Sequence, residues 1–130
     1  MDYSIKNLRE VEDLAPKYGF DEVQESRFPR EDLDSETIGL SLHVVKPGCR
    51  QAFAHRHDQA EEIYVVLSGH GRVKVDDDLR EVGPMDAIRI APRVMRAFEA
   101  GPEGLELLAF GPRHAGDVEM LREDFWAGVS

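Results

Sequence analysis

Residues 38–45, with the sequence IGLSLHVV, decide the fold class of this chain. Apolar and polar residues largely alternate along the segment, and Lys46, Pro47 and Gly48 end it. Because successive side chains of a β-strand point to opposite faces, this period of two predicts a strand with one buried face.

The same kind of segment recurs as far as residue 110. Turn-forming Gly, Pro or Asp residues separate these segments, and turns are predicted at 68–71 (SGHG) and at 101–104 (GPEG). At least eight short strands at a spacing of about ten residues are typical of an all-β sandwich or barrel. Besides 38–45, the predicted strands are 51–57, 62–67, 72–75, 79–82, 86–90, 95–100 and 105–110.

A short helix is predicted ahead of these strands. Asn7 can cap it, with Glu10 three residues later as in a capping box. Leu8, Val11 and Leu14 would share one face of this helix, which Pro16 and Gly19 would end.

The chain is therefore expected to form a single domain over residues 1–130. An N-terminal arm with the short helix would occupy residues 1–37, and the barrel residues 38–110. The C-terminal tail, residues 111–130, carries Phe125 and Trp126 and is expected to dock on the barrel or on a second subunit.

The composition of the chain argues against several classes of partner. Lys and Arg number 16 against 26 Asp and Glu, a formal net charge of −10. Nucleic acids and anionic membranes attract clustered basic residues, so neither is an expected partner. No apolar run approaches the ~20 residues of a membrane-spanning helix. The lone Cys49 and the lack of a signal-peptide pattern favour a cytoplasmic protein whose partner is a small molecule or an ion.

The segment HRHDQAEE at residues 55–62 holds the candidate chemistry. His55 and His57 lie two apart on a predicted strand, so both imidazoles can point to one side. A short turn would then return the chain and bring Glu62 alongside. Two imidazoles and one carboxylate suit iron, manganese, zinc, nickel or copper, and three ligands leave coordination positions open. Two such histidines also arise by chance on a solvated strand, so the pattern alone leaves both interpretations open.

The wider spacing resembles the first conserved motif of the cupin superfamily. The matching residues are Gly48, His55, His57, Glu62 and Gly69, with one extra residue between the first two. The resemblance spans residues 38–110 and indicates a small single-domain cupin of the type 2, conserved-barrel group. It implies a double-stranded β-helix, or jelly-roll barrel, with a divalent metal inside. Homodimers are common among small cupins, so a homodimer is expected.

The second cupin motif is incomplete in this chain. Gly83 and Asp86 match it, and the loop at residues 90–95 fits, but the position of its metal-binding histidine is Arg96. A guanidinium stays protonated and cannot ligate a metal, so the fourth ligand that the resemblance implies is missing.

Arg96 also changes the charge balance. If it points inward, two neutral imidazoles, the Glu62 carboxylate, Arg96 and a divalent ion sum to +2. At a separation of about 5 Å, the ion and Arg96 would repel each other by roughly 6 to 7 kcal/mol at an effective dielectric near 20. Three interpretations stay open. Metal binds weakly with Arg96 swung aside, an anionic ligand bridges the metal and Arg96, or the pocket is metal-free and Arg96 pairs with Glu62.

Other residues share the faces of these side chains. His43 could replace the lost ligand, but a surface or wall position is favoured because it opposes an apolar set on its strand. The predicted substrate-binding residues are Arg96, Gln51, Phe53, Tyr64 and Phe98.

The sequence is therefore compatible with two functions. The first is a metal-dependent enzyme with oxygenase- or isomerase-type chemistry on a small anionic organic molecule. The second is a non-catalytic cupin that binds a small ligand, with or without metal. The resemblance alone cannot choose between them, because one fold hosts many functions.

Overall fold

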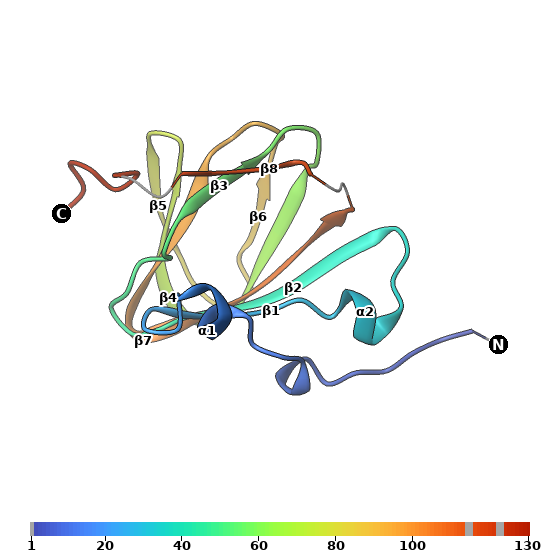
Figure 1. The fold of residues 1–130 in the computed structure, drawn as a ribbon. Coiled ribbons are helices and arrows are strands. Elements are labelled where there is room, and N and C mark those ends of the chain that lie inside the picture. The colour runs from blue at the N-terminus through green and yellow to red at the C-terminus, as the bar shows by residue number, and fades with distance from the viewer. Residues whose placement is uncertain (1, 114–115, 122–123) are drawn as a thin grey trace.

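The computed structural model describes residues 2–113, 116–121 and 124–130. Over these residues the chain folds as one curled eight-stranded sheet with three short helical turns, so the all-β prediction is confirmed (Figure 1). The strands are β1 (Gln24–Arg27), β2 (Ile38–Val45), β3 (Ala54–His57), β4 (Glu62–Val75), β5 (Asp78–Val82), β6 (Ala87–Ile90), β7 (Arg96–Pro112) and β8 (Val118–Leu121). The helical turns are η1 (Leu8–Glu10), α1 (Ala15–Tyr18) and α2 (Arg30–Leu33).

Two long strands hold the barrel together. The 17-residue β7 pairs with β2, β3 and β4, and the 14-residue β4 also pairs with β5 and β6. All of these pairings are antiparallel. The sheet therefore curls around a shared core, which includes Val45, Tyr64, Val66, Val73, Ile90, Phe98, Leu105 and Leu107.

The turns predicted at residues 68–71 and 101–104 are wrong, because β4 and β7 run through these positions. The register between the two strands shifts between Val66 and Ser68 and again between Gly69 and Gly71, so the chain bends at bulges. Gly69 has a φ of 82°, and a Cβ there would lie 2.0 Å from the carbonyl oxygen of Gly104. The glycines therefore allow the backbones of two paired, bent strands to approach closely.

The predicted N-terminal helix is also wrong in its extent. Asn7 does cap a helical turn, since its side chain accepts the Arg9 N–H at 2.9 Å, but this turn is the three-residue η1. The chain is then held against β1, because the Asp13 carboxylate accepts the N–H groups of Ala15 and Ser26. A second turn, α1, follows and ends at Gly19 as predicted, but Pro16, which was also predicted to end the helix, lies in its first turn.

The C-terminal tail docks on the barrel of its own chain. Strand β8 pairs with β3, and the Trp126 ring lies 4.8 Å from the Arg50 guanidinium carbon. The Lys74 ammonium lies 4.0 Å from the Phe125 ring centroid, so two cation–π contacts hold the tail.

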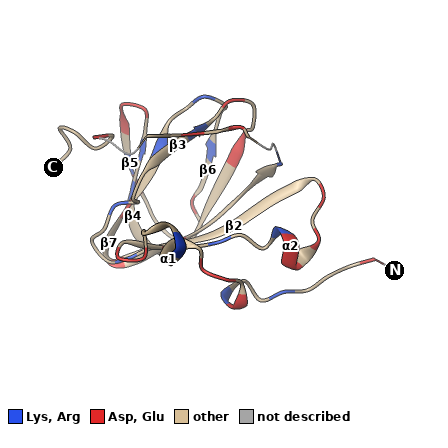
Figure 2. Ribbon diagram, in the orientation of Figure 1, with Lys and Arg blue, Asp and Glu red and all other residues tan. Residues whose placement is uncertain are grey.

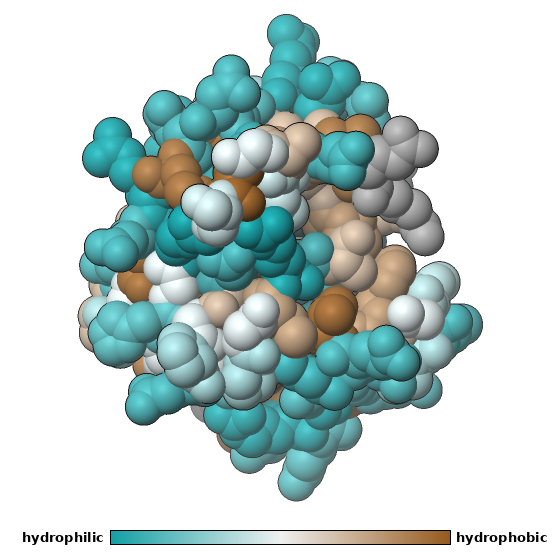
Figure 3. Space-filling model, turned by 90° about the vertical axis from the view of Figure 1, so that its left-hand side faces the viewer, coloured by the Kyte–Doolittle hydropathy of each residue, from teal (hydrophilic) through white to brown (hydrophobic). Residues whose placement is uncertain are grey.

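Charged residues are scattered over strands, loops and helical turns (Figure 2). The face in Figure 3 is mostly hydrophilic, and apolar side chains come to the surface in its hollowed middle. In the described part of the chain, no helix is long and apolar enough to span a membrane.

Candidate metal centre

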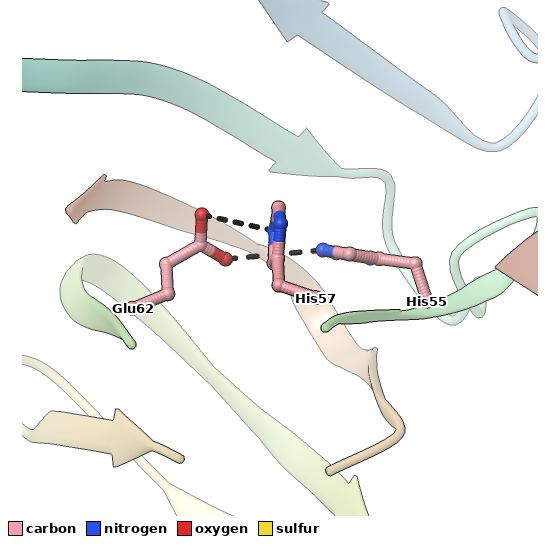
Figure 4. A group of neighbouring side chains, drawn as sticks. All are labelled: His55, His57 and Glu62. Carbon is pink, nitrogen blue, oxygen red and sulfur yellow. Dashed lines mark ion pairs between the residues drawn. The ribbon is translucent and has the colours of Figure 1, made fainter. Parts of the chain in front are cut away.

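His55, His57 and Glu62 converge as the strand pattern predicted. The two histidines lie on β3 and Glu62 begins β4 (Figure 4). His55 Nε2 lies 3.8 Å from Glu62 Oε1, and His57 Nε2 lies 3.6 Å from Glu62 Oε2. One donor atom from each residue lies within 4.8 Å of the other two, so the three side chains could hold a metal ion.

Arg96 approaches this group from β7, where it is paired with His55 across the strands. The residue is only 1% exposed, and its Nη2 donates to Glu62 Oε1 at 2.5 Å. Its Nε donates to the Tyr64 hydroxyl at 3.3 Å, and its Nη1 donates to the Val94 carbonyl at 3.3 Å. Arg96 thus binds one carboxylate oxygen of Glu62, whereas Oε2 is the oxygen nearest His57.

The pKa shifts of Glu62 and His55 favour the protonation states that a metal ligand needs. Burial would raise the pKa of Glu62, but contacts with His55 and His57 and the charge of Arg96 outweigh it and hold this pKa far below its usual value. Burial lowers the pKa of His55, the Arg96 charge adds to this, and Glu62 opposes it. An ionised carboxylate and a neutral imidazole are the forms that bind metals.

Asp117 supports the centre from the tail. Its Oδ2 lies 3.5 Å from His57 Nδ1, a buried atom without a hydrogen bond to any described residue. The Asp117 carboxylate also accepts the N–H groups of Gln59 and Ala60, at 2.8 and 3.1 Å. Burial would raise the pKa of Asp117, but these backbone donors outweigh it and lower this pKa. A carboxylate beside the far nitrogen of a ligating imidazole fixes its tautomer, which would leave Nε2 free for the metal.

Asp117 was missed in the sequence, because it lies far along the chain from the histidines. Only the pairing of β8 with β3 brings it to them. A single carboxylate within the predicted tail, residues 111–130, is too common a signal to have identified it.

The group formed by His55, His57 and Glu62 opens on a cavity of about 340 Å³. Of the predicted substrate-binding residues, Gln51, Phe53 and Tyr64 line this cavity, whereas Arg96 and Phe98 are buried and do not. Gln51 Oε1 also accepts the Phe98 N–H at 3.0 Å. The substrate-binding role of these five residues stays a prediction.

The two terminal segments complete the cavity wall. Leu14, Ala15 and Tyr18 reach it from the arm, and Val118 and Met120 reach it from β8. The sequence did not identify these five as binding residues, nor the further lining residues Phe20, Gln24, Ser26, Phe28, Ser41 and His43. The arm and tail thus belong to the site as much as the barrel does.

His43 also lies in the wall of the cavity, on β2. Burial lowers the pKa of His43 to about 4. The nearby His55 lowers this pKa further, and the Glu62 carboxylate partly opposes both effects. His43 is not one of the three side chains whose donor atoms converge. It is therefore a neutral wall histidine, as favoured from the sequence.

Comparison with known proteins places this arrangement in a family. Residues 41–111 match the family model described as Cupin domain. The polyketide cyclase RemF from Streptomyces resistomycificus has a similar structure, with a TM-score of 0.74 and 24% identity over 95% of this chain and 89% of that one. A cupin protein from Bacteroides fragilis gives a TM-score of 0.69 and 23% identity over 89% and 88%.

Oxalate decarboxylase from Bacillus subtilis is a third similar structure. Its TM-score is 0.63 at 22% identity, over 75% of this chain and 27% of that longer one. The comparison with curated proteins gives no significant match. At identities of 22–24%, these similarities show that the three proteins share the fold of this chain, and they show the fold alone.

Proposed function

Since the chain belongs to the cupin domain family, we propose that it holds a divalent transition metal and acts on a small organic molecule in the cavity. The observation that carries this proposal is the convergence of His55, His57 and Glu62 on one point in the cavity wall. The donor set suits iron, manganese, zinc, nickel or copper.

Each residue has a distinct part in this proposal. His55 and His57 would hold the metal through Nε2, and Glu62 would offer Oε2, since Arg96 donates to Oε1. A metal held there would act as a Lewis acid and polarise an oxygen of the bound organic molecule. Asp117 orients His57 from behind, and the arm and tail exclude water from the ligand.

The charge balance favours an anionic group on the ligand. The three donor residues and Arg96 sum to zero, so a divalent ion leaves the centre at +2. Because Arg96 is buried behind Glu62, an anion would meet the metal and not the guanidinium. We therefore propose a small organic anion as the substrate, and oxygenase- or isomerase-type chemistry as the reaction.

A second candidate function rests on the Arg96–Glu62 ion pair. At 2.5 Å, and with Arg96 buried, the pair satisfies the Glu62 charge without a metal. The alternative is therefore a metal-free, non-catalytic cupin that binds a small ligand.

Metal analysis separates the two candidates. The full chain, purified without an affinity tag or chelator, should hold close to one equivalent of a transition metal. His55→Ala/His57→Ala should lose it, whereas His70→Ala, which changes an exposed histidine, should keep it. Less than about a tenth of an equivalent, unchanged after soaking with iron, manganese or zinc and a dicarboxylate, would favour the metal-free candidate.

A further inference from the structure

A second group of polar side chains lines the same cavity away from the three metal-binding residues. It consists of Gln24 and Ser26 on β1 and of Ser41 and His43 on β2. Ser26 is paired with His43 across the two strands, and Ser41 shares the face of His43 because it lies two residues away. The proposed metal chemistry uses none of these four residues.

Hydrogen bonds join the four side chains into one network. The Ala52 N–H donates to Gln24 Oε1 at 2.8 Å, so the other end of this amide, Nε2, is the donor to Ser26 Oγ at 3.0 Å. Ser26 Oγ lies 3.3 Å from His43 Nδ1, and Ser41 Oγ lies 2.8 Å from His43 Nε2. The imidazole thus bridges two serine hydroxyls.

The two serine hydroxyls and the His43 imidazole carry three protons that can be donated, but only two hydrogen bonds join these groups. A neutral imidazole carries a single N–H, so His43 donates to one serine and accepts from the other. The serine that accepts from His43 keeps its own hydroxyl proton, and no described residue accepts that proton. Whichever tautomer is present, Ser26 or Ser41 therefore has a hydroxyl donor left at the cavity wall.

The rest of the lining bears on the kind of acceptor. Among the described residues that line the cavity, Glu62 is the only Asp, Glu, Lys or Arg. A second charge on a ligand would thus be buried away from any counter-charge, which is costly. Aromatic rings flank both groups, since Phe28 lies 5.7 Å from His43 and Phe53 lies 6.3 Å from His55, between ring centroids.

We propose that the Ser26–His43–Ser41 network is a second binding point, which takes an uncharged acceptor oxygen, such as a carbonyl, on a ligand with an aromatic body. This inference rests on the proposed function, because it names the substrate class of the same cavity. The ligand would thus have one charged end at the metal and a neutral, apolar remainder with a single oxygen acceptor. A molecule with two charged ends does not fit this arrangement.

The test uses two probes that differ in one carbonyl, 2-acetylnaphthalene and 2-ethylnaphthalene. Their dissociation constants are measured by calorimetry on the metal-free full chain, so the result does not depend on the metal. In Ser26→Ala/Ser41→Ala/His43→Phe, the preference for the acetyl probe should fall by about 2- to 12-fold, the loss expected for one hydrogen bond. The ratio of the two constants cancels any general change in the cavity.

The chain offers a matched control on β4. Ser68 and His70 have the same spacing as Ser41 and His43 but are exposed, so Ser68→Ala/His70→Phe should leave the preference unchanged. If the triple variant fails to fold, Ser26→Ala/Ser41→Ala removes both hydroxyls and should still lower the preference. An unchanged preference in the folded variants, or failure of both probes to bind, would overturn the inference and leave the metal analysis unaffected.

Discussion

The two polar groups of the cavity are built on opposite principles. At the end that could hold a metal, Glu62 and Arg96 form a charged pair, and Glu62 also lies beside His55 and His57. At the other wall, Ser26, Ser41 and His43 form a network with no formal charge. The charged group of this cavity therefore has an oppositely charged partner, Arg96 beside Glu62, whereas the other wall offers uncharged hydrogen-bonding groups.

Breaking the charged end should have the largest effect. Glu62→Gln leaves the buried Arg96 guanidinium without its counter-charge, so we expect the metal-free protein to lose about 3 to 5 kcal/mol of unfolding free energy. Urea unfolding measures this loss. Glu106→Gln, which breaks an ion pair with the exposed Arg9, is the control and should cost about 0 to 1 kcal/mol. Equal losses in the two variants would contradict a special role for the buried pair.

The same variant gives a pH dependence with a definite sign. The folded pKa of Glu62 is lowered, so its stabilising contribution is full above its unfolded pKa of about 4.5 and is lost as the pH falls. The stability difference between the wild type and Glu62→Gln should shrink by roughly 1.4 kcal/mol per pH unit below that value. Unfolding curves from pH 6 to pH 3 on metal-free protein measure it, and a difference that grows on acidification would be the opposite sign.

Replacing the charge near the metal should have the next largest effect. Arg96→His removes the repulsion and offers an imidazole at the position paired with His55, so metal affinity should rise by at least about 100-fold. Competition with a metal indicator measures the affinity. Arg89→His, an exposed change on a neighbouring strand, should have no such effect. An unchanged affinity would mean that residue 96 does not face the metal.

Loss of the support behind His57 should have a moderate effect. Asp117→Asn keeps one of the two oxygens that accept the loop N–H groups and removes the charge beside His57 Nδ1, so metal affinity should fall by about 10- to 100-fold. The ¹⁵N shifts of His57 should show a changed tautomer balance, which a purely structural role would not alter. Glu119→Gln, an exposed change on the same segment, serves as the control.

The neutral wall should tolerate removal best. Ser26→Ala/Ser41→Ala/His43→Phe removes the hydrogen bonds among these three residues but leaves the buried Gln24 Nε2 without its acceptor, so the unfolding free energy should fall by about 1 to 3 kcal/mol. A loss of the size expected for Glu62→Gln would show that the network stabilises the fold, and urea unfolding of the two variants side by side decides it.

The convergence of the two histidines and the glutamate could be predicted because the information for it is local. His55, His57 and Glu62 lie within eight residues, and their relation to one face of a strand follows from the β period. Arg96 was identified by counting along the second motif, and the structure places it against Glu62.

The rest of the site could not be predicted in this way. Asp117 reaches His57, and Leu14 and Val118 reach the cavity, through the docking of the tail and arm, which no local pattern encodes. The same limit applies to the fold. A glycine such as Gly69 signals a turn and a bulge equally well, and only the opposite strand decides which one forms.

Anomalous diffraction from a crystal soaked in zinc or manganese would locate a bound metal directly. We expect one strong peak within bonding distance of His55 Nε2, His57 Nε2 and Glu62, and no such peak in His55→Ala/His57→Ala. A peak at surface carboxylates such as Asp76 to Asp78, with none between the two histidines, would contradict this expectation.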